Sequence, residues 1–393
     1  MKESRRRFSR QEYVDRQTKV RQSMREKGVD VLIVTDPSNM CWLTGYDAWS
    51  FYVHQCLVID VNTALLWYGR IIDASAAQMT TDLPATDIIP YPDDYVMSTE
   101  RHPMDYLCGV LRDRQLINGV IGVEMDNYYF SAKAYEALQQ GLPKTKFVDA
   151  TALVNWQRSV KSTAELTYMR QAGAIIKKVY DHILEKAEPG MAKNALVAEI
   201  LHASVSGTDG VAGDYAAIVP LIGAGEEASA CHLTWDDSLI EGDTGVFFEI
   251  AGVVSRYHCP CSRTVYFGKP QKKYREIEAV INEAIANTLP VFAPGRTCGE
   301  VAATFFDTLE KHGFNKDNRC GYPIGLSYPP DWGERTMSLR RTDTTVLQAG
   351  MTFHFMPGMW FDDWGFETTE SLVVTEQGGE CLSSVYRGML VKP

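Results

Sequence analysis

The chain has 393 residues, of which 45% are hydrophobic and 23% charged, a composition typical of a globular protein with two or three domains. Its 39 lysines and arginines against 50 aspartates and glutamates leave a net charge of −11, which argues against binding nucleic acid or an anionic membrane through charge. No apolar run approaches the roughly 18 residues of a membrane span, and nine scattered cysteines suit reduced thiols, so we expect a cytoplasmic protein without a secretory signal.

Residues 1–158 are predicted to form an α/β domain. A polar helix over Arg10–Lys27 should end at Gly28, and a strand over Val29–Val34 should stop at the turn signals Asp36–Asn39. The other predicted elements are strands at residues 56–59, 64–67 and 120–123 and helices around residues 105–112 and 131–140. Strands that alternate with helices favour a sheet covered by helices.

Residues 159–393 are predicted to form a second domain. Ser162 followed by Glu165 has the pattern of a capping box, so a new helix should start at this joint. Two helices separated by Pro189-Gly190 follow, and the same order returns later around Pro294-Gly295. The segments after the two copies are strand-rich and cover residues 247–266 and 352–374. The repeat predicts two similar halves around one site, with ordinary helix punctuation as the alternative.

Four short segments of the second domain hold most of the side chains with chemical capacity. They are Cys231-His232 and residues 248–264, 321–325 and 355–370. Their order and spacing resemble the creatinase/methionine-aminopeptidase family, whose fold is known as pita-bread. Metallopeptidases of that family carry a His, then an Asp, then Asp-x-x-Arg-Thr, Gly-His-Gly-Ile-Gly, Glu-Pro-Gly and a last Glu. Here His232 precedes Glu249 by seventeen positions, Glu249 precedes Pro260 by eleven, and Arg263-Thr264 closes the motif.

The resemblance covers essentially the whole chain. It implies an α/β N-terminal domain over residues 1–158 and an α+β pita-bread domain over residues 159–393 with an internal pseudo-twofold duplication. In this family the N-terminal domain usually covers the active site of a dimer partner, which implies a homodimer.

The five positions that hold two metal ions in the family's peptidases are changed here. Carried over one by one, they fall at Glu249, Pro260, Tyr322, Met356 and Thr369 or Glu370. Pro, Met and a neutral Tyr cannot ligate hard divalent ions, and Glu370 would need a β-bulge to face the same way. We therefore expect no metal and no other cofactor. His258-Cys259-Pro260-Cys261 also suggests zinc, but no second Cys/His pair lies at finger spacing.

Within the family, the chain resembles a metal-free branch, the ectoine hydrolases, more than it resembles creatinase. The resemblance rests on Gly321–Gly325, Pro329–Glu334 and Thr352–Trp360. Ectoine is a six-membered cyclic amidine that carries a carboxylate, and aromatic faces attract such a flat cation by about 0.5–2 kcal/mol each. The residues expected to bind it are Tyr46, Trp49, Tyr322, Met356, Trp360, Trp364, Glu370 and Cys261. Tyr46 and Trp49 are expected to come from the N-terminal domain of a dimer partner.

Glu249 and His232 are the expected catalytic residues. Glu249 lies in an apolar strand, where a charge is costly unless it is used or paired, and Arg263 is the alternative partner. Glu249 would attack the amidine carbon or activate a water, and His232 would protonate the departing ring nitrogen. The product would be an N-acetylated diaminobutyrate. Two alternatives stay open: another C–N hydrolase of this fold, creatinase-like or an Xaa-Pro-type peptidase, and a non-catalytic binding domain.

Overall fold

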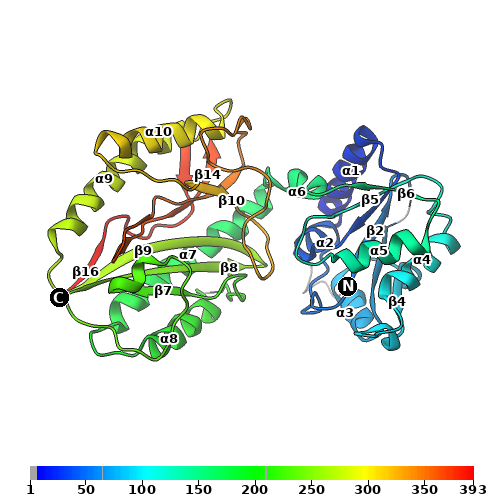
Figure 1. Ribbon diagram of the computed structural model, residues 1–393, viewed down its shortest axis with the longest axis horizontal. Coiled ribbons are helices and arrows are strands. Elements are labelled where there is room, and N and C mark those ends of the chain that lie inside the picture. The colour runs from blue at the N-terminus through cyan, green and yellow to red at the C-terminus, as the bar shows by residue number, and fades with distance from the viewer. Residues whose placement is uncertain (1–6, 64, 209) are drawn as a thin grey trace. The chain divides into compact units, whose positions relative to one another are not determined.

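The computed structural model describes residues 7–63, 65–208 and 210–393 (Figure 1). The chain divides into two compact units, residues 1–158 and 159–393. Residues 1–6, at the start of the first predicted domain, and residue 64, the predicted first residue of a strand, lie outside the described ranges. Within the described ranges, no helix combines the length and the apolar character that a membrane crossing requires.

The N-terminal unit is built on a six-stranded mixed sheet with the strand order β4-β3-β2-β1-β5-β6. The strands are β1 (Val31–Val34), β2 (Cys56–Asp60), β3 (Leu65–Arg70), β4 (Ile88–Tyr91), β5 (Val120–Val123) and β6 (Lys146–Asp149). The helices are α1 (Arg10–Lys27), α2 (Pro37–Thr44), α3 (Ala74–Thr80), α4 (Pro103–Asp113), α5 (Ala132–Gly141) and α6 (Leu153–Arg158). Val31 and Ile33 of β1 pack in one core with Leu107 of α4 and Leu138 of α5, so the amphipathic helices cover that face of the sheet.

The segment that follows the first strand has a second role that was not predicted. Asp36–Asn39 ends the strand, as predicted, and it also begins α2. The Asp36 side chain accepts a hydrogen bond from the Ser38 N–H at 2.7 Å, and Pro37 occupies the first helical position. Both features are helix-start signals. The predicted helix Arg10–Lys27 with Gly28 as its left-handed cap is confirmed.

The C-terminal unit contains two four-stranded sheets, with the orders β16-β9-β8-β7 and β10-β11-β14-β15. Its strands are β7 (Leu221–Ala224), β8 (Thr244–Val254), β9 (Tyr257–Phe267), β10 (Gly321–Pro323), β11 (Thr352–Phe355), β12 (Met359–Trp360), β13 (Gly365–Phe366), β14 (Glu370–Thr375), β15 (Gly378–Cys381) and β16 (Leu390–Lys392). Its helices are α7 (Thr163–Lys186), α8 (Lys193–Ser206), α9 (Lys272–Thr288) and α10 (Cys298–Lys311). Helix α8 lies along one outer side and α9 and α10 along the opposite one, with the strands between them (Figure 1). The predicted capping box of Ser162 and Glu165 starts α7.

The two halves of this unit repeat one backbone pattern at their Pro-Gly turns. Gly190 and Gly295 both adopt a positive φ, +87° and +84°. The N–H of Gly190 donates to the Ile240 carbonyl and that of Gly295 to the Leu347 carbonyl. Three residues after each glycine, the backbone N–H again donates to the carbonyl two residues before that acceptor: Lys193 to Ser238, and Cys298 to Thr345. The same register in both halves supports the predicted internal duplication.

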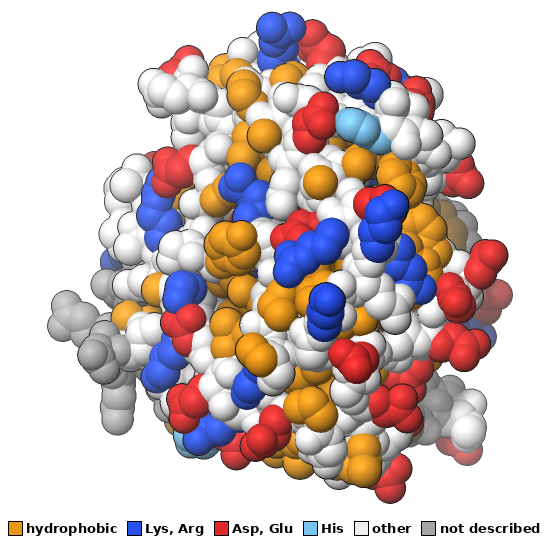
Figure 2. Space-filling view, turned by 90° about the vertical axis from the view of Figure 1, so that its left-hand side faces the viewer, with side chains coloured by type: hydrophobic (Ala, Val, Ile, Leu, Met, Phe, Trp, Pro, Cys, Tyr) orange, Lys and Arg blue, Asp and Glu red, His pale blue; other side chains and the backbone are white. Residues whose placement is uncertain are grey.

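One face of the C-terminal unit carries charges of both signs. Figure 2 shows acidic and basic side chains intermixed over one face, with hydrophobic side chains between them. Such a face lacks the continuous basic patch by which proteins bind nucleic acid electrostatically.

Candidate active site

Glu249 lies within β8, one of the two inner strands of the first sheet. Its neighbours in register are Leu221 on β7 and Ser262 on β9, and its side chain is buried. Burial raises the pKa of Glu249 well above its ordinary value, and the nearby carboxylate of Glu367 raises it further. A carboxyl group in this position holds its proton unless a cation is bound beside it.

A row of polar groups connects the first sheet to the second, from Ser262 through His354 to Glu249. The Ser262 N–H donates to Thr369 Oγ1 at 2.7 Å, and Thr369 Oγ1 lies 2.7 Å from His354 Nε2. His354 Nδ1 lies 3.1 Å from Tyr322 Oη and 4.0 Å from Glu249 Oε1. We call these five residues the floor. Because β8, β9, β10 and β11 all contribute to it, the floor exists only when both halves of the unit are folded.

His354 is the imidazole at the centre of the floor, and it is held neutral. Burial lowers the pKa of His354 to about 3, and the positive charges of Arg263 and Arg319 act in the same direction. The indole Nε1 of Trp332 donates to Tyr322 Oη at 2.7 Å, which leaves the Tyr322 hydroxyl proton for His354 Nδ1. The ring proton of His354 then lies on Nε2 and is donated to Thr369.

Glu367 is a second buried carboxylate that is electrostatically coupled to Glu249. Its side chain is 0% exposed, and neither of its oxygens has a hydrogen-bond partner among the described residues. Burial raises the pKa of Glu367 to about 7, although the positive charge of Lys316 opposes this rise. Lys316 lies 4.2 Å from the Trp360 ring centre, and burial lowers the pKa of its ammonium to about 8, opposed by Glu367. Two interacting buried carboxyl groups of this kind release their protons as a pair, and not independently.

A cavity of about 490 Å³ opens beside Glu249, which is the usual size for a small-molecule site. Of the residues predicted from the sequence, those that line it are Glu249, His232, Tyr322, Met356 and Trp360. The other lining residues are Ile218, Val219, Leu221, Cys231, Thr234, Asn318, Arg319, Pro330 and Asp331. His232 is exposed, whereas Glu249 is buried.

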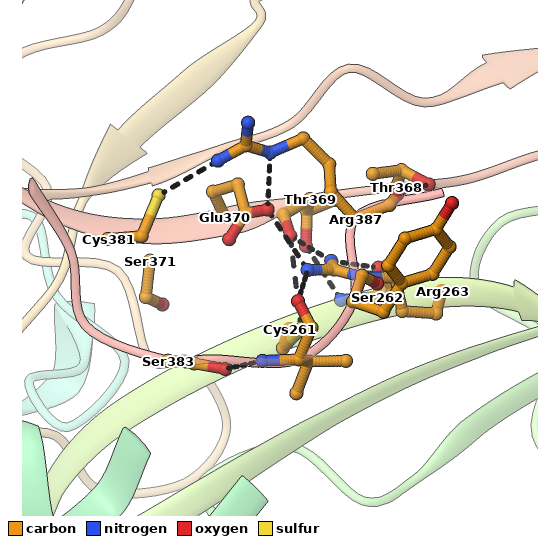
Figure 3. Close-up of polar contacts among 12 residues, drawn as sticks. Cys261, Ser262, Arg263, Thr368, Thr369, Glu370, Ser371, Cys381, Ser383 and Arg387 are labelled. Carbon is orange, nitrogen blue, oxygen red and sulfur yellow. Dashed lines mark hydrogen bonds and ion pairs between the residues drawn. The ribbon is translucent and has the colours of Figure 1, made fainter. Parts of the chain in front are cut away.

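Glu370 and Cys261 are placed outside the cavity. Glu370 Oε1 accepts hydrogen bonds from Arg263 and Arg387, each at 3.0 Å, in the cluster of Figure 3. Thr369 faces the floor, so the next residue on the strand points to the opposite side. Cys261 precedes Ser262 on β9, so its side chain points to the opposite face of the strand. Burial raises the pKa of the Cys261 thiol to about 12. Arg263 therefore pairs with Glu370, and not with Glu249 as in the structural alternative.

Three predicted aromatic residues also lie away from the cavity lining. Trp364 stacks on Phe361 with ring centres 4.3 Å apart and packs against the core of the second half. Tyr46 is buried in the N-terminal unit, where its hydroxyl donates to Gln55 Oε1 at 3.0 Å. Trp49, in the same unit, is 59% exposed, so it is the one of these three whose ring is presented to other molecules.

The donor set does not fit the metal centre of the family's peptidases. Of the five equivalent positions, Pro260 and Met356 offer no hard ligand, and Tyr322 is a phenol whose pKa is raised by burial. Across residues 7–63, 65–208 and 210–393, no group of three or more His, Cys, Asp or Glu side chains could hold a metal ion. His258, in the segment that suggested zinc, instead accepts the Ala217 N–H at 2.9 Å.

The sequence alone did not predict a role for His354 or a place for Glu367 in the site. The alternation of side chains along a strand could have indicated both residues. His354 lies between Phe353 and Phe355, so it points to the face opposite to theirs. Glu367 is two residues before Thr369, so the two side chains point to the same face. What the sequence could not show is the pairing of β10 with β11, which brings Tyr322 next to His354.

Known proteins match this chain over nearly its whole length. Residues 16–160 match the creatinase/prolidase N-terminal domain, and residues 167–376 match metallopeptidase family M24. The chain is 51% identical to the ectoine hydrolase of Halomonas elongata over 98% of both chains, and 43% identical to an uncharacterized hydrolase/peptidase of Sinorhizobium fredii, again over 98% of both. A prolidase structure from Thermococcus sibiricus superposes with a TM-score of 0.84 at 16% identity, covering 97% of this chain and 99% of that one. With its fold, its domain order and these relatives, the chain belongs to metallopeptidase family M24.

Proposed function

We propose that this protein hydrolyses the cyclic amidine ring of ectoine to N-acetyl-2,4-diaminobutyrate without a metal ion. The observation that carries the proposal is the buried carboxyl group of Glu249, which lines a cavity whose metal-ligand positions are replaced and interacts with the buried carboxyl group of Glu367. The 51% identity to an ectoine hydrolase supports the same substrate.

The charge and shape of the cavity suit a cyclic amidinium. Glu249 is a buried carboxyl group that lines the cavity, and a cation bound beside it would stabilise its ionised form. The Trp360 ring and the Tyr322 side chain line the cavity and offer flat faces for a planar ring. Trp360 Nε1 is also buried without a partner among the described residues, so it can donate a hydrogen bond to a bound molecule or water.

The proposed reaction adds one water molecule to the substrate. The amidine carbon gains an oxygen, either from a water activated by Glu249 or through attack by the Glu249 carboxylate followed by hydrolysis. One ring C–N bond then breaks, and the departing nitrogen takes a proton donated by His232. The carbon that carried the amidine becomes the acetyl carbonyl of the product, so no oxidant or reductant is needed.

Product analysis tests this proposal. Purified protein, treated exhaustively with a chelator, is incubated with ectoine, and the products are analysed by mass spectrometry. We expect a product that has gained one water molecule, formed at the same rate before and after chelation. Loss of activity on chelation with recovery on addition of Mn²⁺ would contradict the metal-free mechanism. Cleavage of an Xaa-Pro dipeptide with no turnover of ectoine would favour the peptidase alternative.

A homodimer in the cytoplasm is the second part of the proposal. The exposed ring of Trp49 supports it, since a partner's N-terminal domain could use this ring to cover the cavity. Two more apolar side chains are exposed in this region: Val219, which lines the cavity, and Leu233, which follows the lining residue His232 in sequence. All nine cysteines are free thiols, which is consistent with a reducing compartment.

A further inference from the structure

We propose that Arg319 binds the carboxylate of the substrate and so selects amino-acid-derived cyclic amidines over neutral-tailed ones. This inference rests on the proposed function. It concerns the negative end of the zwitterion, for which neither Glu249 nor His232 provides a receptor.

Arg319 is the only lysine or arginine among the described residues that line the cavity. Its guanidinium is half-buried and forms no ion pair with a described acidic residue. Its one hydrogen bond joins Nη1 to Ser338 Oγ at 3.2 Å, which leaves donors of the fork for another acceptor. The other nearby cation is already engaged, because Lys316 donates to the Gly358 carbonyl at 2.6 Å and interacts with Glu367. Arg319 is therefore the cation that remains for an anionic ligand.

The guanidinium of Arg319 is held in place by its surroundings. It lies 4.5 Å from the centre of the Tyr322 ring, and that ring is fixed through its hydroxyl by Trp332 and His354. The backbone next to it is also pinned, since the Cys320 N–H donates to the Leu339 carbonyl at 3.0 Å. A preorganised guanidinium loses little conformational freedom when it binds a carboxylate with two parallel hydrogen bonds.

The two charged ends of the site, Glu249 and Arg319, line one cavity and are connected through one tyrosine. The Arg319 guanidinium lies over the face of the Tyr322 ring. The Tyr322 hydroxyl contacts His354, and His354 Nδ1 is 4.0 Å from Glu249 Oε1. Glu249 and Arg319 therefore stand at the same tyrosine and line the same cavity. In ectoine, one ring nitrogen and one ring carbon separate the amidine carbon from the carboxylate. A molecule of this size can present its amidine to Glu249 and its carboxylate to Arg319 together.

The test compares ectoine with the same cyclic amidine lacking its carboxylate. We would measure kcat/KM for ectoine, and the inhibition constant of the analogue against ectoine, in the wild type, Arg319→Gln and Arg319→Lys. Arg340→Gln is the matched control, because Arg340 is exposed and does not line the cavity. We expect Arg319→Gln to lower kcat/KM for ectoine by about 10- to 100-fold, the cost of a lost charge-assisted hydrogen bond. The inhibition constant of the analogue should change by less than about 3-fold, and Arg319→Lys should fall between wild type and Gln.

The possible outcomes separate this inference from the proposed function. If the wild type does not hydrolyse ectoine, the proposed function is overturned and this inference with it. If the wild type does hydrolyse ectoine, but Arg319→Gln weakens ectoine and the analogue equally, Arg319 does not bind the carboxylate and only this inference is overturned. A thermal melt of each variant shows whether a loss arises from unfolding, and Arg319→Lys remains the test if Gln does not fold.

Discussion

Glu367→Gln should make the protein more stable at alkaline pH while lowering its activity. Burial raises the pKa of Glu367 from 4.5 to about 7, so the folded state holds this proton more tightly than the unfolded state does. The contribution of such a group to stability is fully present below its unfolded pKa and is lost as the pH rises through the folded pKa. One pKa unit corresponds to about 1.4 kcal/mol, so the wild type should lose about 2.5 kcal/mol between about pH 5 and pH 8 through this group.

Urea denaturation at several pH values measures this effect. The unfolding free energy of wild type minus that of Glu367→Gln should fall by about 2–3 kcal/mol between about pH 5 and pH 8. Glu376→Gln is the matched control, since Glu376 is exposed in the turn between β14 and β15 and should leave the wild-type pH profile unchanged. Turnover of Glu367→Gln should fall, because an amide cannot exchange a proton with Glu249. Parallel stability profiles for wild type and Glu367→Gln would refute the reasoning that this carboxyl is protonated on folding.

Three further predictions concern the reaction and the assembly. Glu249→Gln should lower kcat by at least about 10²-fold, because the amide keeps the shape but is neither basic nor nucleophilic; a folded variant with more than about a tenth of wild-type turnover would contradict this role. His232→Ala should lower kcat by about 10²–10⁴-fold, and the double variant should be little worse than the worse single variant, as steady-state kinetics on ectoine would show. Sedimentation should give a homodimer, and a fully active monomer would argue against the partner's role. Trp49→Ala should raise KM and leave the melting temperature nearly unchanged.

Local signals predicted the helices with defined ends and missed the elements whose start resembles a turn. The capping box at Ser162 and the left-handed Gly28 were readable because cap chemistry is local. Asp36-Pro37 was ambiguous, since the same two residues favour both a turn and a helix start. Strands β4 and β6 were not predicted, because short half-buried strands carry little periodic signal.

The site was predictable only where the family pattern fixed the position of a residue. Glu249, Tyr322 and Met356 fall at family ligand positions, and all three line the cavity. Glu370 was misplaced because the side chain period of a strand is two, so an uncertainty of one residue reverses the face. The proposed role of Arg319 could not be predicted from the sequence, since it depends on Tyr322, three residues later, having a fixed orientation.

The Arg263 cluster of Figure 3 has a consequence for how the chain folds during synthesis. Arg263 is fully buried, and it donates to the carbonyls of Tyr386 and Val385 as well as to Glu370. Its most distant acceptor is 123 residues later in the chain, which a ribosome needs about 6–25 s to add. Until then the guanidinium has no complete set of acceptors, and burying it would be costly. The strand that carries Ser262 into the floor therefore cannot reach its final packing before Val385 and Tyr386 have been synthesised.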